Sequence, residues 1–187
     1  SAIHADYHVP VRIGTDAALA LSMCKVIIDA GLYQKQFVQE QTDLPLLIRK
    51  DNGRFLRGKD LNDAEREDQF YWWDTSTNTL AAAPRHTLAT TGVDPALEGS
   101  FQVMLKDGKT VEVEPGFVRL RRHLEDYEPE KAAAVCEVNA DNIRSLARKV
   151  ATRKTKIFLG WNSGKYYHGD LMERSMALLL GLTGNWG

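Results

Sequence analysis

The sequence has little of what marks a disulfide-stabilised, membrane-spanning or nucleic-acid-binding protein. Its only two cysteines, Cys24 and Cys136, are far apart, so the chain has no disulfide framework and no cluster-ligand spacing of its own. We expect both thiols to be buried. The formal net charge of -1 gives no bulk attraction to nucleic acid, and no apolar run is long enough to cross a bilayer or typical of a signal peptide. We therefore expect neither nucleic-acid binding nor direct membrane insertion.

The two ends of the sequence lack the marks of a complete protein. The chain begins at Ser1 without an initiator methionine and stops inside the glycine-rich stretch 182–187. We therefore expect a piece of a longer protein. With 187 residues and average apolar content, the chain is still long enough to form a domain with its own core.

The stretch 12–31 reads as a strand end, a sharp turn and one helix. Thr15 or Asp16 can act as the N-cap, and Gly31 supplies the left-handed residue that ends the helix. The helix is apolar nearly all round, which predicts burial inside a larger α/β body. Its N-terminal amides and positive dipole end favour an anion or another ligand that accepts hydrogen bonds.

The carboxylate of Asp16 suggests a specific ligand. Guanine offers adjacent N–H donors on its Watson–Crick edge, and an ionised carboxylate can accept both. Gly14 lets the backbone approach a ligand closely, so Asp16 is a candidate guanine reader. In the alternative interpretation, Gly14, Thr15 and Asp16 form only a turn and a helix cap.

The first residues of the chain carry a weaker signal. His4, Asp6 and His8 alternate, which would put them on one face of a strand as potential metal ligands. The alternative is an ordinary strand or loop leading to the turn at Gly14, where Pro10 disfavours a helix. We expect no metal site here.

The segment 43–115 alternates short apolar runs with turn signals, which predicts antiparallel hairpins. The charged run 59–68 between them is typical of a solvated loop. Each of the three expected hairpins pairs two runs: 46–49 with 54–57, 70–74 with 79–83, and 101–106 with 109–114. We interpret the whole segment as an antiparallel insertion.

Beyond the insertion the pattern becomes helical again. We expect helices over 116–127, 129–138, 143–152 with Asn139 as N-cap, and 171–182, and a buried parallel strand over 156–160. The predicted fold class is therefore α/β: a partial doubly wound parallel sheet with helices on both faces and an antiparallel hairpin insertion. Residues 1–42 and 116–187 would form an incomplete α/β lobe, and 43–115 the insertion.

The loop after the expected strand is the second informative stretch. In open α/β sheets, ligands bind at the carboxyl ends of strands, and here the strand is followed by Trp161, Asn162, Ser163, Gly164, Lys165 and His168. A lysine offers positive charge to an oxyanion, and a histidine can donate or accept a hydrogen bond. Alternatively, Lys165 is simply solvent-exposed and His168 caps the following helix. The density of polar groups favours a site.

The two stretches together resemble the catalytic subunits of the dimethyl sulfoxide reductase family of molybdopterin oxidoreductases. The resemblance covers nearly the whole chain, in order and spacing, with one departure, Ile13, where the family usually has proline. The insertion resembles the branch that holds nitrate, chlorate and selenate reductases, dimethyl sulfide dehydrogenase and ethylbenzene dehydrogenase. The matching motifs are His4-Ala5-Asp6, 11–19, Leu32-Tyr33, Phe37-Val38, 42–45, 53–57, Tyr167-His168-Gly169-Asp170 and 182–187.

The resemblance implies molybdenum held by two molybdopterin guanine dinucleotides. In this interpretation the lobe of 1–42 and 116–187 binds that cofactor. Gly14, Thr15 and Asp16 would hold one guanosine end, while 161–168 would lie near a pterin and the metal. Trp161, Asn162, Ser163 and Gly164 are then cofactor-binding candidates, and Lys165 and His168 are catalytic candidates, with Lys165 facing the substrate.

The resemblance also implies parts that these residues do not supply. The molybdenum ligand and a 4Fe-4S cluster would lie outside the chain, an iron–sulfur subunit would exchange electrons, and the complete enzyme would be periplasmic and serve anaerobic respiration. The expected reaction is a two-electron oxygen-atom transfer or hydroxylation of a small-molecule or oxyanion substrate, and the fragment alone should be inactive. The alternative from another class is a self-contained guanine-nucleotide-binding or interaction domain without redox activity.

Overall fold

The computed structural model describes residues 2–87, 89–90, 92–160 and 163–186, and it divides into two compact units. The helical unit comprises Ser1–Gln34 and Leu124–Gly187, and the strand unit comprises Lys35–His123. The strand unit therefore extends eight residues further on each side than the insertion 43–115 expected from turn signals. It includes a short helix before its first strand and another after its last.

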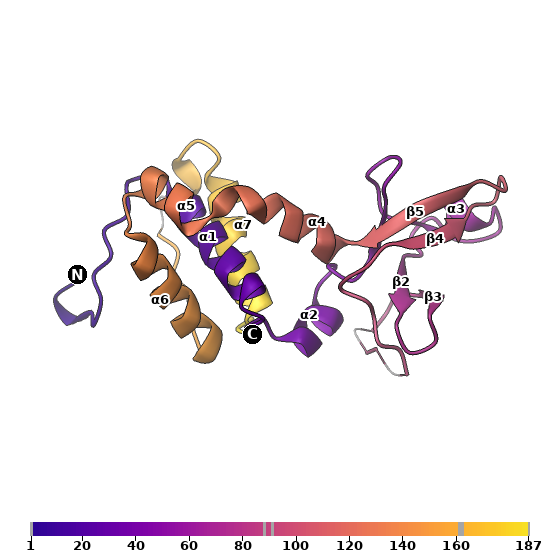
Figure 1. Ribbon diagram of the computed structural model, residues 1–187, viewed down its shortest axis with the longest axis horizontal. Helices are drawn as coiled ribbons and strands as arrows, with labels where there is room; N and C mark the ends of the chain where they lie inside the picture. The colour runs from indigo at the N-terminus through magenta and orange to yellow at the C-terminus, as the bar shows by residue number, and fades with distance from the viewer. Residues whose placement is uncertain (1, 88, 91, 161–162, 187) are drawn as a thin grey trace. The chain divides into compact units, whose positions relative to one another are not determined.

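Helix α1 (Asp16–Asp29) is the centre of the helical unit. It packs against α5 (Pro129–Cys136), α6 (Ala140–Thr152) and α7 (Gly169–Leu182) (Figure 1). Its neighbours explain why the helix is apolar nearly all round, since residues on several of its faces are buried. These include Ala20, Met23, Cys24, Ile27 and Ile28. The predicted burial of both cysteines is confirmed.

Helices α1 and α7 run in the same direction. Gly31, with φ of +63°, ends the first helix as predicted, and the amide of Gln34 then donates to the carbonyl of Leu182 at 2.9 Å. This bond ties together the chain just beyond one helix and the last residue of the other. Because the helices are in contact and meet at their C-terminal ends, their N-termini lie at the same end of the helical unit.

One partly buried ion cluster interrupts the apolar surface of α1. The ammonium of Lys25, whose side chain is only 11% exposed, lies 2.8 Å from a carboxylate oxygen of Asp29 and 3.2 Å from one of Glu128. The hydrogen bond from Lys25 to Asp29 is the largest cause of the raised pKa of the lysine. The cluster connects α1 to the segment that begins α5.

The strand unit contains two antiparallel sheets. One has the order β1-β5-β4 and the other pairs β2 with β3. The hairpins predicted over 70–83 and 101–114 are confirmed. The first predicted hairpin forms over a short stretch, where the bridge between Ile48 and Phe55 is flanked by two backbone hydrogen bonds of 2.8 Å, from Arg49 to Arg54 and from Leu56 to Leu47. The other edge of β1 pairs with β5. The strands are β1 (Leu47–Arg49), β2 (Tyr71–Asp74), β3 (Thr79–Ala82), β4 (Phe101–Met104) and β5 (Thr110–Pro115).

The core of the strand unit comes from alternate residues of β4 and β5, together with Leu47 of β1 and Leu56 from the segment beside it. Leu47, Leu56, Val103, Val111 and Val113 form a buried cluster, as the pleat requires when one face of a sheet is covered. The remaining helices are short, and α3 occupies the start of the run expected to be a solvated loop. They are η1 (Ala2–His4), α2 (Lys35–Gln41), α3 (Gly58–Leu61), α4 (Gly116–His123), η2 (Leu124–Tyr127) and η3 (Ser163–Lys165).

The parallel sheet expected from the sequence is not seen. Every named strand belongs to the strand unit and every pairing is antiparallel. Residues 156–160 are irregular, and Phe158 is 92% exposed. A strand needs a neighbour to satisfy its amides and carbonyls, and the described part of the helical unit contains no strand that could provide one. The mixed α/β class is confirmed, but the doubly wound arrangement is not.

Candidate functional site

The turn that precedes α1 is fixed on one side and open on the other. The amide of Arg12 donates to the carbonyl of Cys136 at 3.0 Å, and the hydroxyl of Thr15 donates to the carbonyl of Arg12 at 2.7 Å. Gly14 has φ of +81°, and a Cβ atom added there would meet nothing within 4 Å. The tightest part of the turn therefore has open space beside its backbone.

The N-terminus of α1 has no side-chain cap among the described residues. Thr15 occupies the N-cap position, but its hydroxyl closes the turn to Arg12 instead of accepting from the helix. Asp16 is the first helical residue and is half-buried. A helix end without a side-chain cap leaves amide donors and the positive end of the dipole available to a ligand.

The N-terminus of α7 has a related construction. His168 is its N-cap residue, with a left-handed φ of +56° and no side-chain cap hydrogen bond. The amides of Gly169 and Leu171 donate to the carbonyls of Tyr166 and His168 at 2.8 and 3.0 Å. The ring of Tyr167 lies 4.0 Å from that of His168, centroid to centroid. His168 is thus a positional cap, and its imidazole remains exposed.

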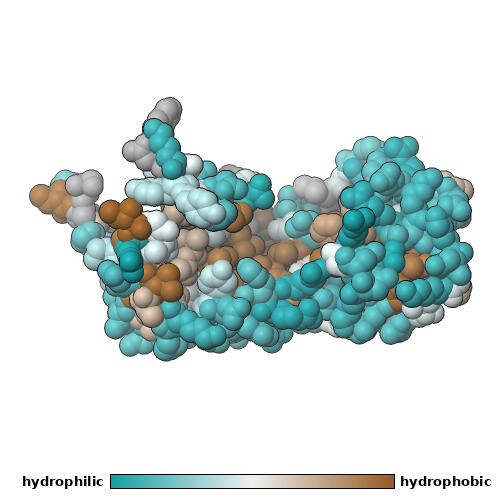
Figure 2. All heavy atoms as spheres, turned by 90° about the horizontal axis from the view of Figure 1, so that it is seen from above, coloured by the Kyte–Doolittle hydropathy of each residue, from teal (hydrophilic) through white to brown (hydrophobic). Residues whose placement is uncertain are grey.

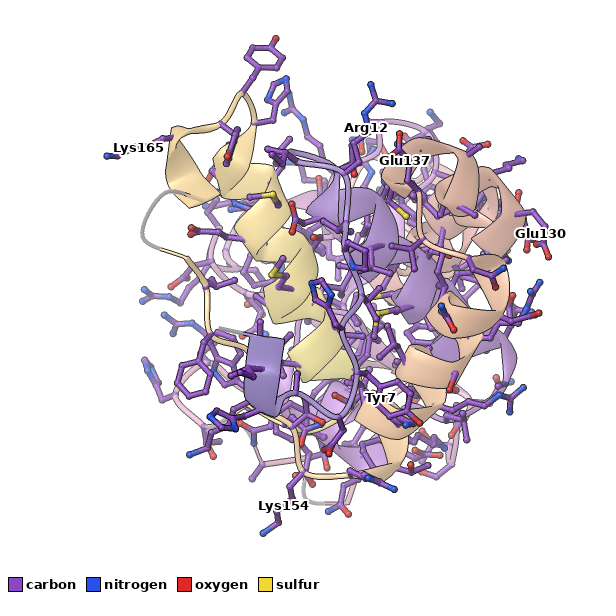
Figure 3. All side chains as sticks on the ribbon, turned by 90° about the vertical axis from the view of Figure 1, so that its left-hand side faces the viewer. Tyr7, Arg12, Glu130, Glu137, Lys154 and Lys165 are labelled. Carbon is purple, nitrogen blue, oxygen red and sulfur yellow. The ribbon has the colours of Figure 1, made fainter. Side chains whose placement is uncertain are left out.

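The two candidate stretches lie at the same end of the helical unit. Figure 3 shows Arg12, from the turn before α1, and Lys165, just before α7, at that end. The ammonium of Lys165 is exposed, whereas the guanidinium of Arg12 lies 3.8 Å from the carboxylate of Glu137. Residues about 150 positions apart in the sequence are therefore arranged around two neighbouring helix N-termini.

The rest of the predicted site is only partly described. Trp161 and Asn162 lie outside the described residues, and Ser163 is described only as the backbone that begins η3. Gly164 is exposed, and a Cβ atom added there would be 3.8 Å from the carboxylate of Glu173. The structure therefore places Gly164, Lys165 and His168 near Gly14, Thr15 and Asp16 only to the extent that they share one end of the unit.

The N-terminal histidines lie apart from this arrangement. His4, Asp6 and His8 belong to an exposed, mostly irregular segment, where Tyr7 contacts the ammonium of Lys149 at 3.4 Å from its ring centroid. The hydrogen bond from Lys149 lowers the pKa of Tyr7. Within the described residues no group of three or more histidine, cysteine, aspartate or glutamate side chains is placed to hold a metal ion.

None of the described helices has the length and apolar character needed to cross a membrane.

Sequence reasoning missed a pocket of about 730 Å³ in the strand unit. It lies beside the turn that follows β1, and Arg54, Arg57 and Lys59 contribute to its lining. The signal available in the sequence was the close spacing of these three cations after an Asn-Gly turn. By itself that spacing indicates only a hairpin arm and the start of a solvated loop.

In comparisons with known proteins, the whole chain matches part of the alpha subunits of several oxidoreductases. It is 37% identical to the dimethylsulfide dehydrogenase subunit alpha of Rhodovulum sulfidophilum, 39% to the perchlorate reductase subunit alpha of Dechloromonas aromatica and 37% to the chlorate reductase subunit alpha of Ideonella dechloratans. Each match covers 100% of this chain but 21–23% of the relative. The chain thus spans about a fifth of the length of these curated relatives. The resemblance inferred from the sequence is thereby confirmed.

The match to a solved structure concerns the fold alone. Acetylene hydratase from Pelobacter acetylenicus aligns with 97% of this chain and 15% of its own, with a TM-score of 0.54 and 21% sequence identity. No family model matches the chain.

Proposed function

We propose that this chain, homologous along its whole length to a segment of alpha subunits of the dimethyl sulfoxide reductase family, contributes part of the cofactor site of a molybdenum oxidoreductase. The observation that carries the proposal is that the two stretches singled out in the sequence, 14–16 and 163–168, share one end of the helical unit. The names of the relatives support the class of enzyme.

The turn before α1 has the chemistry to hold the guanosine end of a molybdopterin guanine dinucleotide. Asp16 supplies acceptor oxygens that complement the N–H donors of guanine. The open space beside Gly14 permits close approach of a ligand to the backbone. The uncapped N-terminus of α1 offers donors and a favourable dipole to a phosphate group. These residues therefore fit the proposed cofactor.

The segment before α7 would act nearer the reaction centre. The bound molybdenum cofactor supplies a two-electron redox centre. Lys165 would bind an anionic substrate or stabilise negative charge that develops during the reaction. His168, whose exposed imidazole can donate or accept a hydrogen bond, would position substrate or carry a proton. Trp161, Asn162, Ser163 and Gly164 would contact the pterin.

The complete protein would transfer an oxygen atom to or from its substrate, or hydroxylate it. Relatives named for perchlorate and chlorate reduction and for dimethylsulfide oxidation support an oxyanion or a small neutral molecule as substrate, and fold alone does not select between them. We further propose a 4Fe-4S cluster, an iron–sulfur partner subunit and a periplasmic location for the complete enzyme.

The test measures cofactor retention in the complete protein. Asp16→Asn turns one acceptor oxygen into a donor facing the N–H groups of guanine, so we expect cofactor binding to weaken by about 1–3 kcal/mol. Elemental mass spectrometry for molybdenum and chromatography of released guanine nucleotide provide the readout. Lys165→Ala should instead lower turnover and leave the molybdenum content intact. Asp141→Asn, which alters an acid in the first turn of α6, is the matched control.

Three results would count against parts of the proposal. Unchanged molybdenum and guanine in Asp16→Asn would return residues 14–16 to the role of a turn and cap. Loss of molybdenum in Lys165→Ala would make Lys165 a structural residue. Guanine nucleotide without molybdenum in the native protein would support the alternative of a nucleotide-binding domain without redox activity.

A further inference from the structure

The pocket of about 730 Å³ in the strand unit has an uneven distribution of charge around it. Arg54, Arg57 and Lys59 line it, and Arg119 donates to the carbonyl of a lining residue, Gly53, at 3.0 Å. None of these four cations lies within ion-pair distance of a carboxylate among the described residues; Lys59 acts on Asp63, the partner of Lys106, only at longer range. All other lysines and arginines of the strand unit pair with an aspartate or glutamate. The unneutralised positive charge of this unit is therefore concentrated at one pocket.

The cations at the pocket are held without being neutralised. The guanidinium of Arg57 lies 5.0 Å from the ring centroid of Phe70 and donates to the carbonyl of Glu67 at 3.4 Å. The ammonium of Lys59 donates to the carbonyl of Asp63 at 2.8 Å. A ring face or a carbonyl orients a cation but leaves its full charge. The side chains are thus positioned while their charge stays available to a ligand.

The acidic residues of the lining do not cancel this charge. Asp60 accepts from the guanidinium of Arg49 at 2.6 Å and from the amide of Arg57 at 2.9 Å. Its ion-pair partner is therefore Arg49, which also pairs with Asp51, and not one of the four cations. Glu67 is the other carboxylate in the lining. Even when both carboxylates are counted against the three lining cations, the pocket stays positive, and at this position a bound anion would gain more than a neutral molecule.

We propose that this pocket binds a multiply charged small oxyanion, a molecule carrying phosphate or several carboxylate groups. The guanidinium groups of Arg54 and Arg57 match the paired oxygens of such groups, and Lys59 adds a point charge. The volume exceeds what a single small anion needs, and Phe55 and Ile48 give part of the lining an apolar surface. The ligand therefore combines at least two anionic groups with a small organic or bridging part. This site is separate from the one in the helical unit and needs no molybdenum.

Inorganic pyrophosphate is the first probe and citrate is the second, measured by isothermal titration calorimetry on the complete protein. Binding of pyrophosphate over citrate identifies phosphate chemistry, and the reverse identifies carboxylate chemistry. We expect Arg54→Gln to weaken binding about tenfold, as loss of one charge-assisted contact predicts, and Lys59→Gln to weaken it by a smaller factor. Arg121→Gln is the matched control, because this exposed arginine of the same unit pairs with Glu98 at 2.9 Å; it should leave the affinity unchanged.

Three outcomes would overturn the proposal: binding of neither probe, equal binding by wild type and Arg54→Gln, or equal weakening by Arg54→Gln and Arg121→Gln. Circular dichroism checks that each variant is folded, and Lys59→Gln provides a second independent change if Arg54→Gln is not. The cofactor experiment at Asp16 gives a separate result, because molybdenum and guanine content do not depend on these cations.

Discussion

The two units treat their apolar surface differently. Among the residues that the structure describes, the strand unit exposes one large apolar side chain, Met104, whereas the helical unit exposes many. Figure 2 shows the same contrast on one face, where the strand unit is mostly hydrophilic and apolar residues gather on the helical unit. The exposed apolar residues of the helical unit are Ile3, Tyr7, Ile13, Val135, Phe158, Leu159, Tyr166, Tyr167, Leu171 and Trp186.

This difference shows how each unit covers the apolar residues of its core. Hairpins bury alternate residues against one another within one stretch of sequence, so the strand unit can cover its own apolar face. The helical unit builds its core around α1, but residues 156–160 expose an apolar run that no strand of this unit covers. An exposed run of this kind is typical of a surface made for another segment or partner. The helical unit is therefore the one whose apolar residues are less completely covered by its own described residues.

The largest expected effect on stability comes from truncating one buried side chain in each of the two cores. Ile27 in the helical unit and Leu56 in the strand unit are both 0% exposed, so Ile27→Ala and Leu56→Ala should each cost about 2–5 kcal/mol through lost burial and cavity formation. Hydrogen exchange followed by mass spectrometry on the complete protein would locate the loss. Ile27→Ala should accelerate exchange in α1 and α7 and spare the β2–β3 hairpin, and Leu56→Ala should do the opposite. Equal acceleration in both units would show that they unfold together and would remove the contrast.

A smaller effect is expected at the start of α6. The side chain of Asn139 accepts from the amide of Asp141 at 2.8 Å, so Asn139→Ala should destabilise the helical unit by about 1 kcal/mol through loss of the cap. Denaturant unfolding measures the change. Asn139→Asp retains an acceptor and is the matched control. A control that loses as much stability as Asn139→Ala would mean that the cap hydrogen bond is not the cause.

The most local effect is expected at acid pH in the strand unit. The buried carboxylate of Asp74 accepts from the amide and hydroxyl of Ser76, the hydroxyl of Thr77 and the amide of Asp94. The hydrogen bond from the Ser76 hydroxyl is the largest cause of the lowering of the Asp74 pKa to about 2. Because the folded-state pKa lies below the unfolded value of about 3.9, this carboxylate stabilises the fold above that value and stops doing so as the pH falls towards 2.

Hydrogen exchange of the turn between β2 and β3 should therefore accelerate between pH 4 and pH 2, after correction for the intrinsic pH dependence of exchange. Asp74→Asn cannot titrate, so the variant should lose this extra acceleration. The same acceleration in wild type and variant would assign the acid sensitivity to another group. Lys25 of the helical unit does not itself titrate in this window, because its pKa is raised and the stabilisation linked to that shift is lost as the pH rises through it.

Local signals predicted most of the elements. Asn139 as a helix cap, Gly31 as a helix end and the two complete hairpins depend on hydrogen bonds and backbone angles within a few residues, so a short window of sequence contains them. The strand predicted over 156–160 is wrong, because its formation depends on residues outside any short window of sequence. Its apolar run indicates that the segment favours burial, but a strand also requires a partner, and no local pattern shows where that partner lies.

The candidate site also has features that local sequence predicts and features that it does not. Gly14 and Asp16 could be singled out because turn geometry and acceptor chemistry are properties of the residues themselves. Their position at one end of a unit with Lys165 required the parallel packing of α1 and α7. The cationic pocket was missed because its character depends on which cations lack carboxylate partners, and that is decided by distances between segments far apart in the sequence.

The sequence by itself determined the turns, the caps, the apolar centre of the helical unit and the family to which the chain is similar, since each depends on residue type and spacing. Only the tertiary structure decided that β1 pairs with β5 across more than sixty residues, that Lys25 meets Glu128, and that three cations share a pocket. The physical reason is that burial and charge pairing are gained between distant segments, and the chain adopts whichever combination leaves the fewest apolar groups in water and the fewest buried charges unpaired.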